Sequence, residues 1–575
     1  MKPIIGIDLG TTNSEVAVLR EGQPFVISDS TGNHMLPSFV GLSPTGEMLV
    51  GESARNQYIA APERTVKSIK RKMGSDERVS LDEETYTPQE ISAFILRRLK
   101  GIADEFLDKP VEQAVITVPA YFSDKQRQAT KDAGEIAGLE VVRIINEPTA
   151  AALAYGLDRE EDQFLIVYDL GGGTFDVSVI EINSGVVEVR ASRGNTELGG
   201  DDFDAALVKY IAEDFRQQNG VDLEADRRAL ARLTRAAELA KIELSDAPFA
   251  QIQEEFIATE GGKPLHLEME IERSRFEELI NDMLESTIEC VNQALQDASL
   301  SADEIDKVLL VGGSTRIPMV SNMVEDVMMA QPRLEIDPDL CVGMGASVQA
   351  GIIAGEPIDA VLVDVTPHSL GIEVAAWHLG TPIPDQYSVL IRRNTAVPVS
   401  KSEVYTTLTP DQESVAIKVY QGEEQIASHN TLLGEFLLEG VKRTKRGQPE
   451  IVVNFDYDVN GIVHVSAQDK QTDAEQEIMV TATPDRLTEE QKAEATERVG
   501  DTEILWDAVP TDSHEEAIVL RNRAMEVFAS LADGGEKTEL QELISALDTA
   551  LSTRDEEAID ESQDELLDLL YDLEE

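Results

Sequence analysis

The stretch Asp8-Leu-Gly-Thr-Thr12 returns in altered form as Asp169-Leu-Gly-Gly-Gly-Thr174, and this duplication decides the fold. Each copy follows a short apolar run and precedes alternating apolar residues, with Val16 and Val177 both eight positions beyond their aspartates. A strand, a glycine-rich turn and a returning strand produce this pattern. We therefore expect two similar lobes, each carrying one such turn.

Two turns of this kind can hold a nucleoside triphosphate between them. Glycine lets the backbone approach a phosphate closely and turns N–H groups toward it. Threonine hydroxyls donate further hydrogen bonds, and an aspartate at a strand end holds Mg²⁺ through water. One glycine-rich aspartyl turn alone is typical of an ordinary hairpin. Two turns with the same offsets favour a clamp that grips one nucleotide from both sides.

The composition indicates a multidomain globular protein. The chain has 575 residues, 42% of them hydrophobic, and a prior of about 150 residues per domain predicts about three or four domains. No apolar stretch approaches the ~20 residues of a membrane span, and the residues before Asp8 are too few for a signal peptide. Two cysteines, Cys290 and Cys341, give no disulfide framework. These features favour a cytoplasmic location.

The net charge is the compositional outlier. There are 49 basic and 109 acidic residues, which gives −60 and argues against nucleic acid and anionic membranes as partners. One interpretation is a surface that repels acidic substrates and accepts basic or apolar ones. The other, which we favour, is a solvated acidic surface adapted to high salt, where screening reduces self-repulsion.

The pattern changes twice along the chain. Residues 1 to about 355 alternate strand-like runs with helical periods, as in an α/β domain. From there to about residue 482 short alternating strands and frequent turn signals predict an antiparallel β-sandwich. Beyond Thr488 the chain is predicted to be helical, on the apolar spacing of Leu540, Leu543, Ile544, Leu547 and Leu551.

Longer blocks of sequence resemble the Hsp70 chaperone family along essentially the whole chain. The blocks that carry this resemblance are Gly6-Ile-Asp-Leu-Gly-Thr-Thr-Asn-Ser14, Ile116-Thr-Val-Pro-Ala-Tyr-Phe122, Ile145-Asn-Glu-Pro-Thr-Ala-Ala-Ala152, Asp169-Leu-Gly-Gly-Gly-Thr-Phe-Asp176, Leu198-Gly-Gly-Asp-Asp-Phe-Asp204, Val311-Gly-Gly-Ser-Thr-Arg316 and Asp364-Val-Thr-Pro367. Several departures, among them a shortened lid, look most like the short bacterial HscC-type branch.

The resemblance implies a multidomain chain with four successive parts. Residues 1–356 would form an α/β actin-like (duplicated ribonuclease-H-like) ATPase domain, and 357–366 an apolar linker. Residues 367–483 would form an all-β sandwich that holds extended peptides, and 484–575 a short α-helical lid. ATP binding would open the sandwich and lid, and hydrolysis would close them.

The resemblance also implies an ATP site with Mg²⁺, and K⁺ as a further candidate cation. Its catalytic residues would be Lys70, Glu147, Thr174 and Asp176. Asp8 and Asp169 would orient the water ligands of Mg²⁺. The remaining nucleotide contacts would be Gly10, Thr11, Thr12, Asn13, Gly171, Gly172, Gly173, Gly199, Glu238, Lys241, Ser245, Gly312, Gly313, Ser314 and Arg316. No P-loop pattern is present, so the aspartates must hold the metal, and one cation with one water-aligning carboxylate suits phosphoryl transfer.

Peptide binding and coupling are implied for a second group of residues. Val415 and Ile417 match the lining of the peptide pocket, and Ala375 and Leu408 match two residues that arch over the peptide. Alternating apolar residues in a sandwich are, however, usually core. The coupling residues would be Pro119, Arg127 and the linker residues Val361, Leu362 and Val363. The linker could dock on the ATPase domain as an extra strand when ATP is bound, or be a simple sheet strand.

The expected partners are unfolded or extended client polypeptides and a J-domain co-chaperone, while the need for a nucleotide-exchange factor stays open. Two positions and one segment depart from the family: Glu15 stands where many members have cysteine, His368 stands where leucine is common, and the segment 376–387 is longer. An alternative function is a small-molecule kinase of the actin-like superfamily, for which we find no second substrate pocket in the sequence. A module whose ATPase has decayed is another alternative, and the complete catalytic set argues against it.

Overall fold

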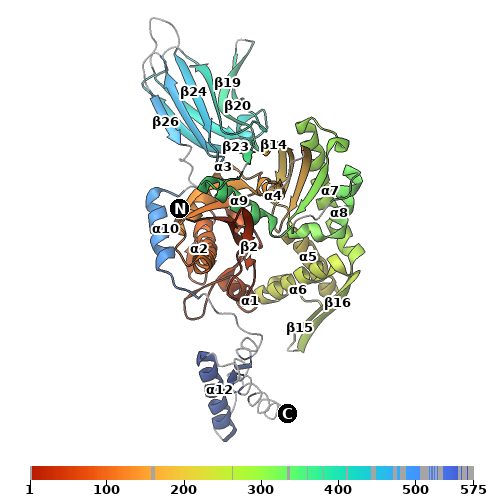
Figure 1. The fold of residues 1–575 in the computed structure, drawn as a ribbon. Helices are drawn as coiled ribbons and strands as arrows, with labels where there is room; N and C mark the ends of the chain where they lie inside the picture. Colours follow the sequence, from red (N-terminus) through yellow and green to blue (C-terminus); the bar gives the residue numbers. More distant parts are fainter. Residues whose placement is uncertain are drawn as a thin grey trace. The chain divides into compact units, whose positions relative to one another are not determined.

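A computed structural model describes residues 3–156, 162–261, 263–332, 337–358, 360–379, 381–409, 412–441, 449–470, 475–479 and 487–505, and beyond these 517, 520–521, 524, 528, 535–553, 558–559, 562 and 566. The chain divides into two compact units, Met1–Ile504 and Leu505–Glu575, and each is described by itself. The first unit holds the two predicted lobes and the β-rich region (Figure 1).

The first lobe is built on a mixed sheet in the order β11-β10-β1-β2-β3, with β4 beside β2. Its strands are β1 (Ile4–Asp8), β2 (Asn13–Arg20), β3 (Gln23–Val26), β4 (Leu36–Pro37), β10 (Gln113–Val118) and β11 (Glu140–Asn146). β1 runs antiparallel to β2 and parallel to β10. The helices of this lobe are α2 (Pro88–Leu107) and α3 (Asp124–Ile136), and both begin with a capping box.

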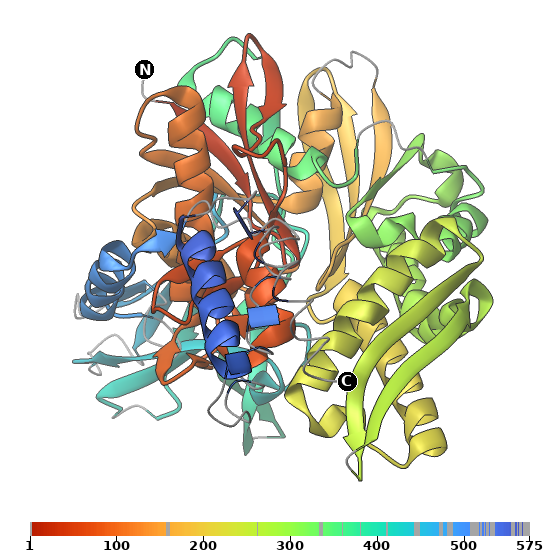
Figure 2. The ribbon, with the colours of Figure 1, turned by 90° about the horizontal axis from the view of Figure 1, so that it is seen from below.

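The second lobe repeats this arrangement in the order β17-β12-β13-β14-β18. Its strands are β12 (Gln163–Leu170), β13 (Phe175–Asn183), β14 (Val186–Asn195), β17 (Lys307–Val311) and β18 (Val361–Val363). β12 is antiparallel to β13 and parallel to β17, as β1 is to β2 and β10. The predicted duplication of strand, turn and returning strand is therefore confirmed, and the two lobes lie side by side (Figure 2).

Helices join and cover the two sheets. They are α4 (Glu147–Gly156), α5 (Gly200–Asn219), α6 (Arg227–Asp246), α7 (Arg273–Ala298), α8 (Pro318–Met328) and α9 (Cys341–Ala354). α4 and α9 pack between the sheets, where Ala150, Ala152, Ala346 and Ala350 are fully buried beside residues of β12 and β13. Small side chains let helix and sheet backbones approach closely, which explains the alanine-rich sequences of both helices.

Smaller elements complete the lobes. The first lobe carries α1 (Glu52–Ala60), β5 (Val40–Leu42), β6 (Met48–Val50), β7 (Thr65–Val66), β8 (Val79–Leu81), β9 (Glu84–Tyr86), η1 (Pro62–Arg64) and η2 (Ile69–Lys72). The second carries the hairpin β15 (Phe249–Glu260) and β16 (Lys263–Glu272), with η3 (Leu223–Ala225), η4 (Ala302–Glu304) and η5 (Gly313–Arg316).

The region after β18 consists of two four-stranded sheets that share one hydrophobic core. The first, in the order β20-β19-β22-β23, comprises β19 (Leu370–His378), β20 (Thr381–Ile391), β22 (Ser414–Gln421) and β23 (Thr431–Glu439), with η6 (Ala427–His429) nearby. The second, in the order β21-β24-β25-β26, comprises β21 (Val399–Thr406), β24 (Glu450–Tyr457), β25 (Val463–Asp469) and β26 (Glu475–Met479). All pairings within the two sheets are antiparallel.

Helix α10 (Glu489–Asp501) packs on the first lobe. Its Ala495 and Val499 are buried in the same core as residues of α2. Lys492 pairs with Asp132 and Glu135 of α3 at 3.0 and 2.9 Å, and the Arg498 guanidinium lies 3.9 Å from the Tyr86 ring centroid. The prediction of helix from Thr488 holds for α10, with Thr488 as its cap. The helix then ends, and Glu503 accepts a backbone hydrogen bond from Met48 of β6.

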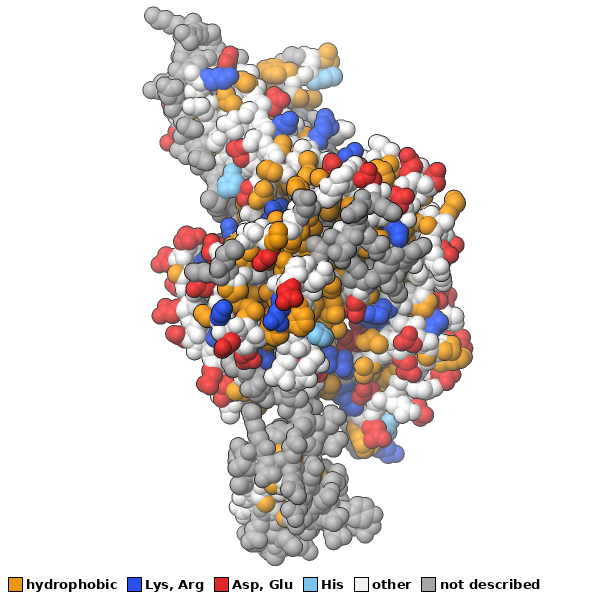
Figure 3. All heavy atoms as spheres, viewed as in Figure 1, with side chains coloured by type: hydrophobic (Ala, Val, Ile, Leu, Met, Phe, Trp, Pro, Cys, Tyr) orange, Lys and Arg blue, Asp and Glu red, His pale blue; other side chains and the backbone are white. Residues whose placement is uncertain are grey.

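The second unit contains α12 (Gly535–Thr553). Leu540, Ile544 and Leu547 are buried there in a cluster with Ala517 and Leu566, so the predicted apolar spacing faces a core. β27 (Ile504–Leu505) stands at the boundary between the units. Among the residues that the structure describes, no helix combines the length and apolarity needed to cross a membrane. Red acidic side chains are spread widely over the face seen in Figure 3.

Candidate active site

The two glycine-rich turns lie against each other. Asp8 pairs with Glu15 across the β1–β2 turn, and Asp169 pairs with Asp176 across the β12–β13 turn. A Cβ added at Gly172 would lie only 1.9 Å from Thr12 Oγ1. The two turns therefore approach to a distance that only glycine allows, as a clamp requires.

The same close approach extends along the second turn. A Cβ at Gly173 would lie 2.7 Å from Thr11 Cγ2, and one at Gly199 would lie 2.5 Å from the Gly173 backbone nitrogen. The N–H of Gly171 donates to the carbonyl of Thr174 at 3.1 Å and closes the turn. The predicted phosphate-binding residues of both lobes are thus brought together at one place.

Lys70 and Glu147 form a buried ion pair beside the turns. Lys70 lies in η2 of the first lobe, and Glu147 is the first residue of α4, where the helix dipole favours a carboxylate. Burial raises the pKa of Glu147 to about 7, although Lys70 opposes the shift. Burial alone would lower the pKa of Lys70, but Glu147, Asp8 and Asp169 outweigh it and raise the pKa.

Three more carboxyl groups of the predicted site have raised pKa values. Burial raises the pKa of Asp8, which also accepts a 2.6 Å hydrogen bond from the Thr117 hydroxyl. Burial, then the charge of Glu147, raises the pKa of Asp169 and of Asp176 well above the usual range. If all these carboxyl groups were ionised beside one lysine, they would leave an excess of negative charge, which a cation would neutralise.

This donor set fits Mg²⁺. Carboxylate oxygens are the ligands that Mg²⁺ prefers, and the metal usually keeps several waters. Asp8 and Asp169 stand at equivalent positions, each at the end of the strand that precedes its turn. They are the residues that would hold the hydrated ion from the two lobes.

Asp176 is fixed by backbone donors. The N–H of Ala120 donates to its Oδ2 at 3.1 Å, and the N–H of Tyr121 donates to its Oδ1 at 3.0 Å. Thr174, two residues earlier, is buried at the end of the turn. Asp176 therefore has a set orientation before any ligand binds.

The predicted adenosine contacts gather beside Gly200. Lys241 Nζ donates to Asp204 at 2.8 Å and to the carbonyl of Gly200 at 3.2 Å. From the other side the Ser314 hydroxyl donates to the carbonyl of Gly171 at 2.9 Å. A Cβ at Gly200 would meet both Ser314 Oγ and Lys241 Nζ, at 2.8 and 3.1 Å. α6 and η5 thus approach the second turn from two sides.

The other predicted nucleotide contacts lie around this group. On α6, Glu238 pairs with Arg235 at 3.0 Å, and the Ser245 hydroxyl donates to the Lys241 carbonyl at 3.3 Å. Arg316 pairs with Asp339 at 2.5 Å, while Gly313 precedes Ser314 in η5. Gly312 has a φ of 83°, and a Cβ there would lie 2.5 Å from the Leu170 carbonyl. In the first turn, a Cβ at Gly10 would collide with the Asn13 carbonyl.

Two contacts that bridge the lobes were missed by the sequence reasoning. The Ser68 hydroxyl donates to Asp201 at 2.6 Å, and Arg71 pairs with Asp202 at 3.1 Å. Both pairs flank predicted site residues, since Lys70 lies between Ser68 and Arg71, and the aspartates follow Gly199. Asp201 and Asp202 lie inside the matched block Leu198–Asp204, but nothing in the sequence indicates which residues of the other lobe they contact.

Glu15 was noticed only as a departure from the family. It is buried, and its Oε1 accepts a 2.7 Å hydrogen bond from the N–H of Gly343 in the first turn of α9. Burial raises the pKa of Glu15 well above its usual value, and Asp8 adds to the shift. The side chain thus links β2 to α9, a helix that begins without a side-chain cap.

Pro119 opens a tight turn beside Asp176, and Arg127 of α3 packs against that turn. The Phe122 N–H donates to the Pro119 carbonyl at 3.1 Å. The buried Arg127 side chain donates to the carbonyls of Ala120 and Phe122 at 2.9 and 3.2 Å. On the far side, Tyr121 contacts His368 of the β-rich region.

The linker residues Val361, Leu362 and Val363 form β18, which pairs in parallel with β14 from Val186 to Glu188. Asp364, the next residue, accepts hydrogen bonds from Asn146 at 2.8 Å and Thr149 at 3.2 Å. Asp359, within the predicted linker, lies outside the described residues.

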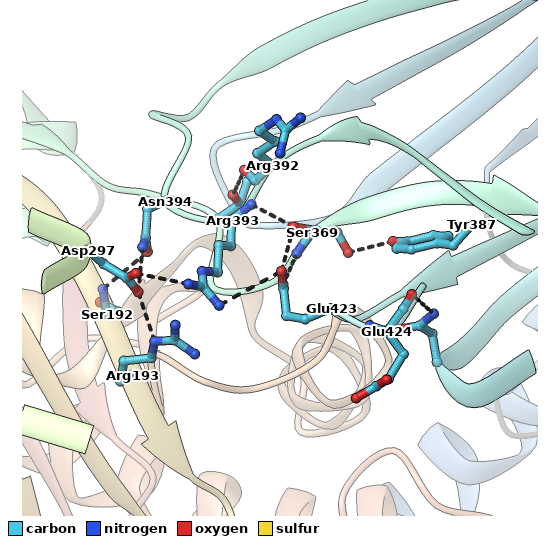
Figure 4. Close-up of polar contacts among 12 residues, drawn as sticks. Ser192, Arg193, Asp297, Ser369, Tyr387, Arg392, Arg393, Asn394, Glu423 and Glu424 are labelled. Carbon is cyan, nitrogen blue, oxygen red and sulfur yellow. Dashed lines mark hydrogen bonds and ion pairs between the residues drawn. The ribbon is translucent and has the colours of Figure 1, made fainter. Parts of the chain in front are cut away.

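Asp297 of α7 joins the second lobe to the β-rich region (Figure 4). It pairs with Arg193 of β14 and with Arg393, both at 2.9 Å, and accepts a 3.3 Å hydrogen bond from Asn394. Arg393 also approaches Glu423 at 3.9 Å. The Asp297 carboxylate thus accepts hydrogen bonds from both the second lobe and the β-rich region.

The four predicted peptide contacts occupy different environments. Ile417 is 3% exposed in the core shared by the two sheets, and Val415 packs partly against that core. Leu408 is 48% exposed, and Ala375 on β19 is half-buried. The role of these four residues in peptide binding stays a prediction.

Comparison with protein families gives the context for this site. A family model described as "Hsp70 protein" matches residues 4–575. Members of this family are ATPases that use ATP and Mg²⁺, and they generally bind client polypeptides and J-domain co-chaperones. The match spans both lobes with their paired turns, the β-rich region and the helical C-terminal part. The chain belongs to the Hsp70 family.

Proposed function

We propose that this chain is a chaperone in which ATP binding and hydrolysis at the paired turns control the grip on extended apolar segments of unfolded proteins. The two sheets after β18 would be the substrate-binding sandwich, and the helical C-terminal part its lid. The observation that carries the proposal is the run of contacts from Asp176 through Tyr121 to His368. It connects the predicted hydrolysis site with the predicted peptide-binding region through one residue.

The residues of the site have defined tasks in this proposal. The N–H groups and hydroxyls of the two turns would bind the phosphates, and Asp8 and Asp169 would hold the waters of Mg²⁺, which would supply charge neutralisation. Lys70 contacts the γ-phosphoryl group, while Glu147 and Asp176 orient the attacking water. A pKa near 7 suits Glu147 Oε1 to accept a proton from that water.

The linker supports the coupling part of the proposal. β18 adds a parallel strand to the sheet that carries the second turn, and Asp364 anchors its end. A change at the turn between β12 and β13 would reach β18 through β14, because these strands are neighbours. Nucleotide state would in this way set whether the linker stays paired.

Several finer points belong to the same proposal. The client would be an extended, aliphatic-rich segment, bound through backbone hydrogen bonds and an apolar slot. A J-domain protein would stimulate hydrolysis, and K⁺ would assist Mg²⁺. The departures at Glu15 and His368 support placement in the HscC-type branch. The protein would act in the cytoplasm, as its two cysteines without a disulfide framework favour.

The test compares Lys70→Ala with Lys72→Ala. Lys70 is buried in the ion pair with Glu147, whereas Lys72 pairs with Glu77 at the surface. We expect Lys70→Ala to lower the rate of ATP hydrolysis about 100-fold or more, and Lys72→Ala to leave it unchanged. Unchanged hydrolysis in Lys70→Ala would refute the site.

Removing Lys70 leaves Glu147 buried without its partner, which destabilises a fold. The double variant Lys70→Met with Glu147→Gln keeps the shape and removes both charges. We expect it to fold and to bind ATP but not to hydrolyse it. Hydrolysis at the normal rate in this variant would contradict the proposal.

A further inference from the structure

The hairpin between β19 and β20 extends beyond the core that the rest of the two strands build. Ala376 pairs with Ile383, Trp377 with Pro382 and His378 with Thr381. Leu370 and Ile372 at the start of β19 are buried. We call Trp377, Leu379 and Ile383 the hairpin tip. Their exposed fractions are 63%, 94% and 43%, large values for apolar side chains on neighbouring positions.

Leu379 adopts a backbone conformation that leucine rarely takes. Its φ is +50°, in the left-handed region. Leu379 and Gly380 are the two residues between the paired His378 and Thr381, and loops of this length favour asparagine, aspartate or glycine where φ is positive. A non-glycine residue there carries a conformational cost. A costly, fully exposed leucine indicates a function for its side chain.

The segment that carries the tip contains no charged residue. Residues 374–384 contain no lysine, arginine, aspartate or glutamate, in a chain that is 27% charged. Contiguous exposed apolar side chains mark interaction sites, whereas scattered ones do not. In Figure 3, orange side chains lie over this end of the two sheets.

The edge of the sheet is protected against strand pairing. β20 is an edge strand, and its Pro382 and Pro384 lack the N–H that a ladder needs. A partner must therefore be held by side-chain contact with the tip. A second copy of this chain fits poorly, because two copies of charge −60 repel each other.

We propose that the hairpin tip is a second binding subsite for client polypeptide, one that takes a large apolar side chain of a neutral or basic segment. The inference rests on the proposed chaperone function and deepens it. Ala375, which the family resemblance assigns to the peptide site, stands two residues before Trp377 on β19, so the tip would continue that site. Clients that reach both places bind more tightly than clients that reach one, because the second contact becomes intramolecular.

Two labelled peptides test this subsite with the full-length protein. The short peptide has an aliphatic centre only, and the long one adds a Leu-Phe pair behind a Gly-Ser spacer of varied length. We expect the long peptide to bind about tenfold more tightly, which is what burial of one or two large apolar side chains supplies.

Variants of the tip separate the subsite from the fold. Leu379→Asn should lower the affinity for the long peptide about tenfold, leave the short peptide unchanged, and keep or raise the melting temperature, since asparagine suits a positive φ. Trp377→Ser should act on the long peptide in the same way, and Thr381→Ser should change nothing.

Fluorescence gives an independent readout, because the chain has only two tryptophans, Trp377 and Trp506. In a Trp506→Phe variant we expect the long peptide, and not the short one, to shift Trp377 emission to the blue. Equal affinity for both peptides in the wild-type protein would contradict this inference alone. Binding of neither would contradict the proposed function and this inference together. Dimerisation that Leu379→Asn abolishes would show a second copy as the occupant and overturn the proposal.

Discussion

Asp176 and His368 contact the same residue from opposite sides. The Tyr121 N–H donates to Asp176 at 3.0 Å, and the Tyr121 carbonyl lies 3.2 Å from His368 Nε2. The rings of Tyr121 and His368 pack edge to face, with their centroids 4.2 Å apart. If Asp176 shifts during hydrolysis, Tyr121 should move with it. The contacts of His368, at the start of the β-rich region, would then change as well.

The His368 contact predicts a specific dependence on pH. Burial lowers the pKa of His368 to about 4, with Glu423, Arg127 and Arg193 as the charged groups around it, whereas an exposed histidine has a pKa near 6.5. Above pH ~6.5 the ring is neutral in both states. As pH falls from about 6.5 to about 4, only the unfolded or undocked form takes up the proton, so the docked form loses up to about 1.4 kcal/mol per pH unit.

Unfolding by urea between pH 7 and pH 5 measures this loss. His368→Leu should remove it, because leucine fills the site without titrating. The raised pKa values of Glu147 and Asp169 act with opposite sign, since stability from such carboxyls is lost as pH rises. They are common to both proteins, so the difference isolates His368. Parallel pH profiles would contradict the contact.

Gly172 and Gly171 form a matched pair for testing the clamp. A Cβ at Gly172 would lie 1.9 Å from Thr12 Oγ1, whereas the nearest atom to a Cβ at Gly171 is 3.8 Å away. Gly172→Ala should therefore push the turns apart and weaken ATP binding at least about tenfold, as overpacking costs 1–3 kcal/mol. Gly171→Ala should bind ATP almost normally. Calorimetric titration with ATP measures both affinities. Equal ATP affinities of the two variants would show that the two turns do not contact each other.

Asp297 should couple the second lobe to the β-rich region. A double-mutant cycle of Asp297→Ala with Arg393→Ala should give a coupling free energy of about 1–3 kcal/mol, because both side chains are largely shielded from water. The exposed pair Arg216–Glu213 is the control and should give less than about 0.5 kcal/mol. Similar coupling free energies in the two cycles would show that the Asp297–Arg393 pair does not couple the second lobe to the β-rich region.

Helix α10 should stabilise the first lobe. Val499 is fully buried in the core with α2, while Glu489 of the same helix is exposed. Val499→Ala should lower the free energy of unfolding by about 2 kcal/mol and speed hydrogen exchange in α2, and Glu489→Ala should do neither. Unchanged exchange in α2 would mean that α10 is not held there.

The charge of −60 predicts that salt stabilises the protein. Added KCl screens the repulsion among acidic side chains, so the melting temperature should rise between low and high KCl. Scanning calorimetry over a KCl series checks this. A melting temperature indifferent to salt would count against adaptation to high salt.

The strands and helices with a strong period could be predicted from the sequence. Helix α7 carries such a period, with the buried residues Phe276, Ile280 and Leu284 four positions apart. Helix α6 begins at Arg227 because the Asp226 side chain caps it by accepting from the N–H groups of Arg228 and Ala229. A capping side chain is a local signal that the apolar period does not contain.

Contacts between residues far apart in the sequence could not be predicted from the periodicity of apolar residues. Ser68 and Asp201, or Asp297 and Arg393, are brought together by packing of whole lobes, which leaves no local signal. The end of α10 at Asp501 was missed for the same reason, since the chain there exchanges helical hydrogen bonds for one to Met48 of β6. Glu147, Thr174 and Asp176, whose catalytic role stays a prediction, could be assigned because they lie in long blocks that resemble a family.

The central claim is that nucleotide at the paired turns sets the grip on peptide. Its most direct test is the release of a fluorescent peptide from a preformed complex with the ADP-bound protein, followed by stopped flow after ATP or ADP is added. The account predicts fast release with ATP, slow release with ADP, and loss of the ATP effect in Gly172→Ala. Equal release rates with both nucleotides in the wild-type protein would contradict it.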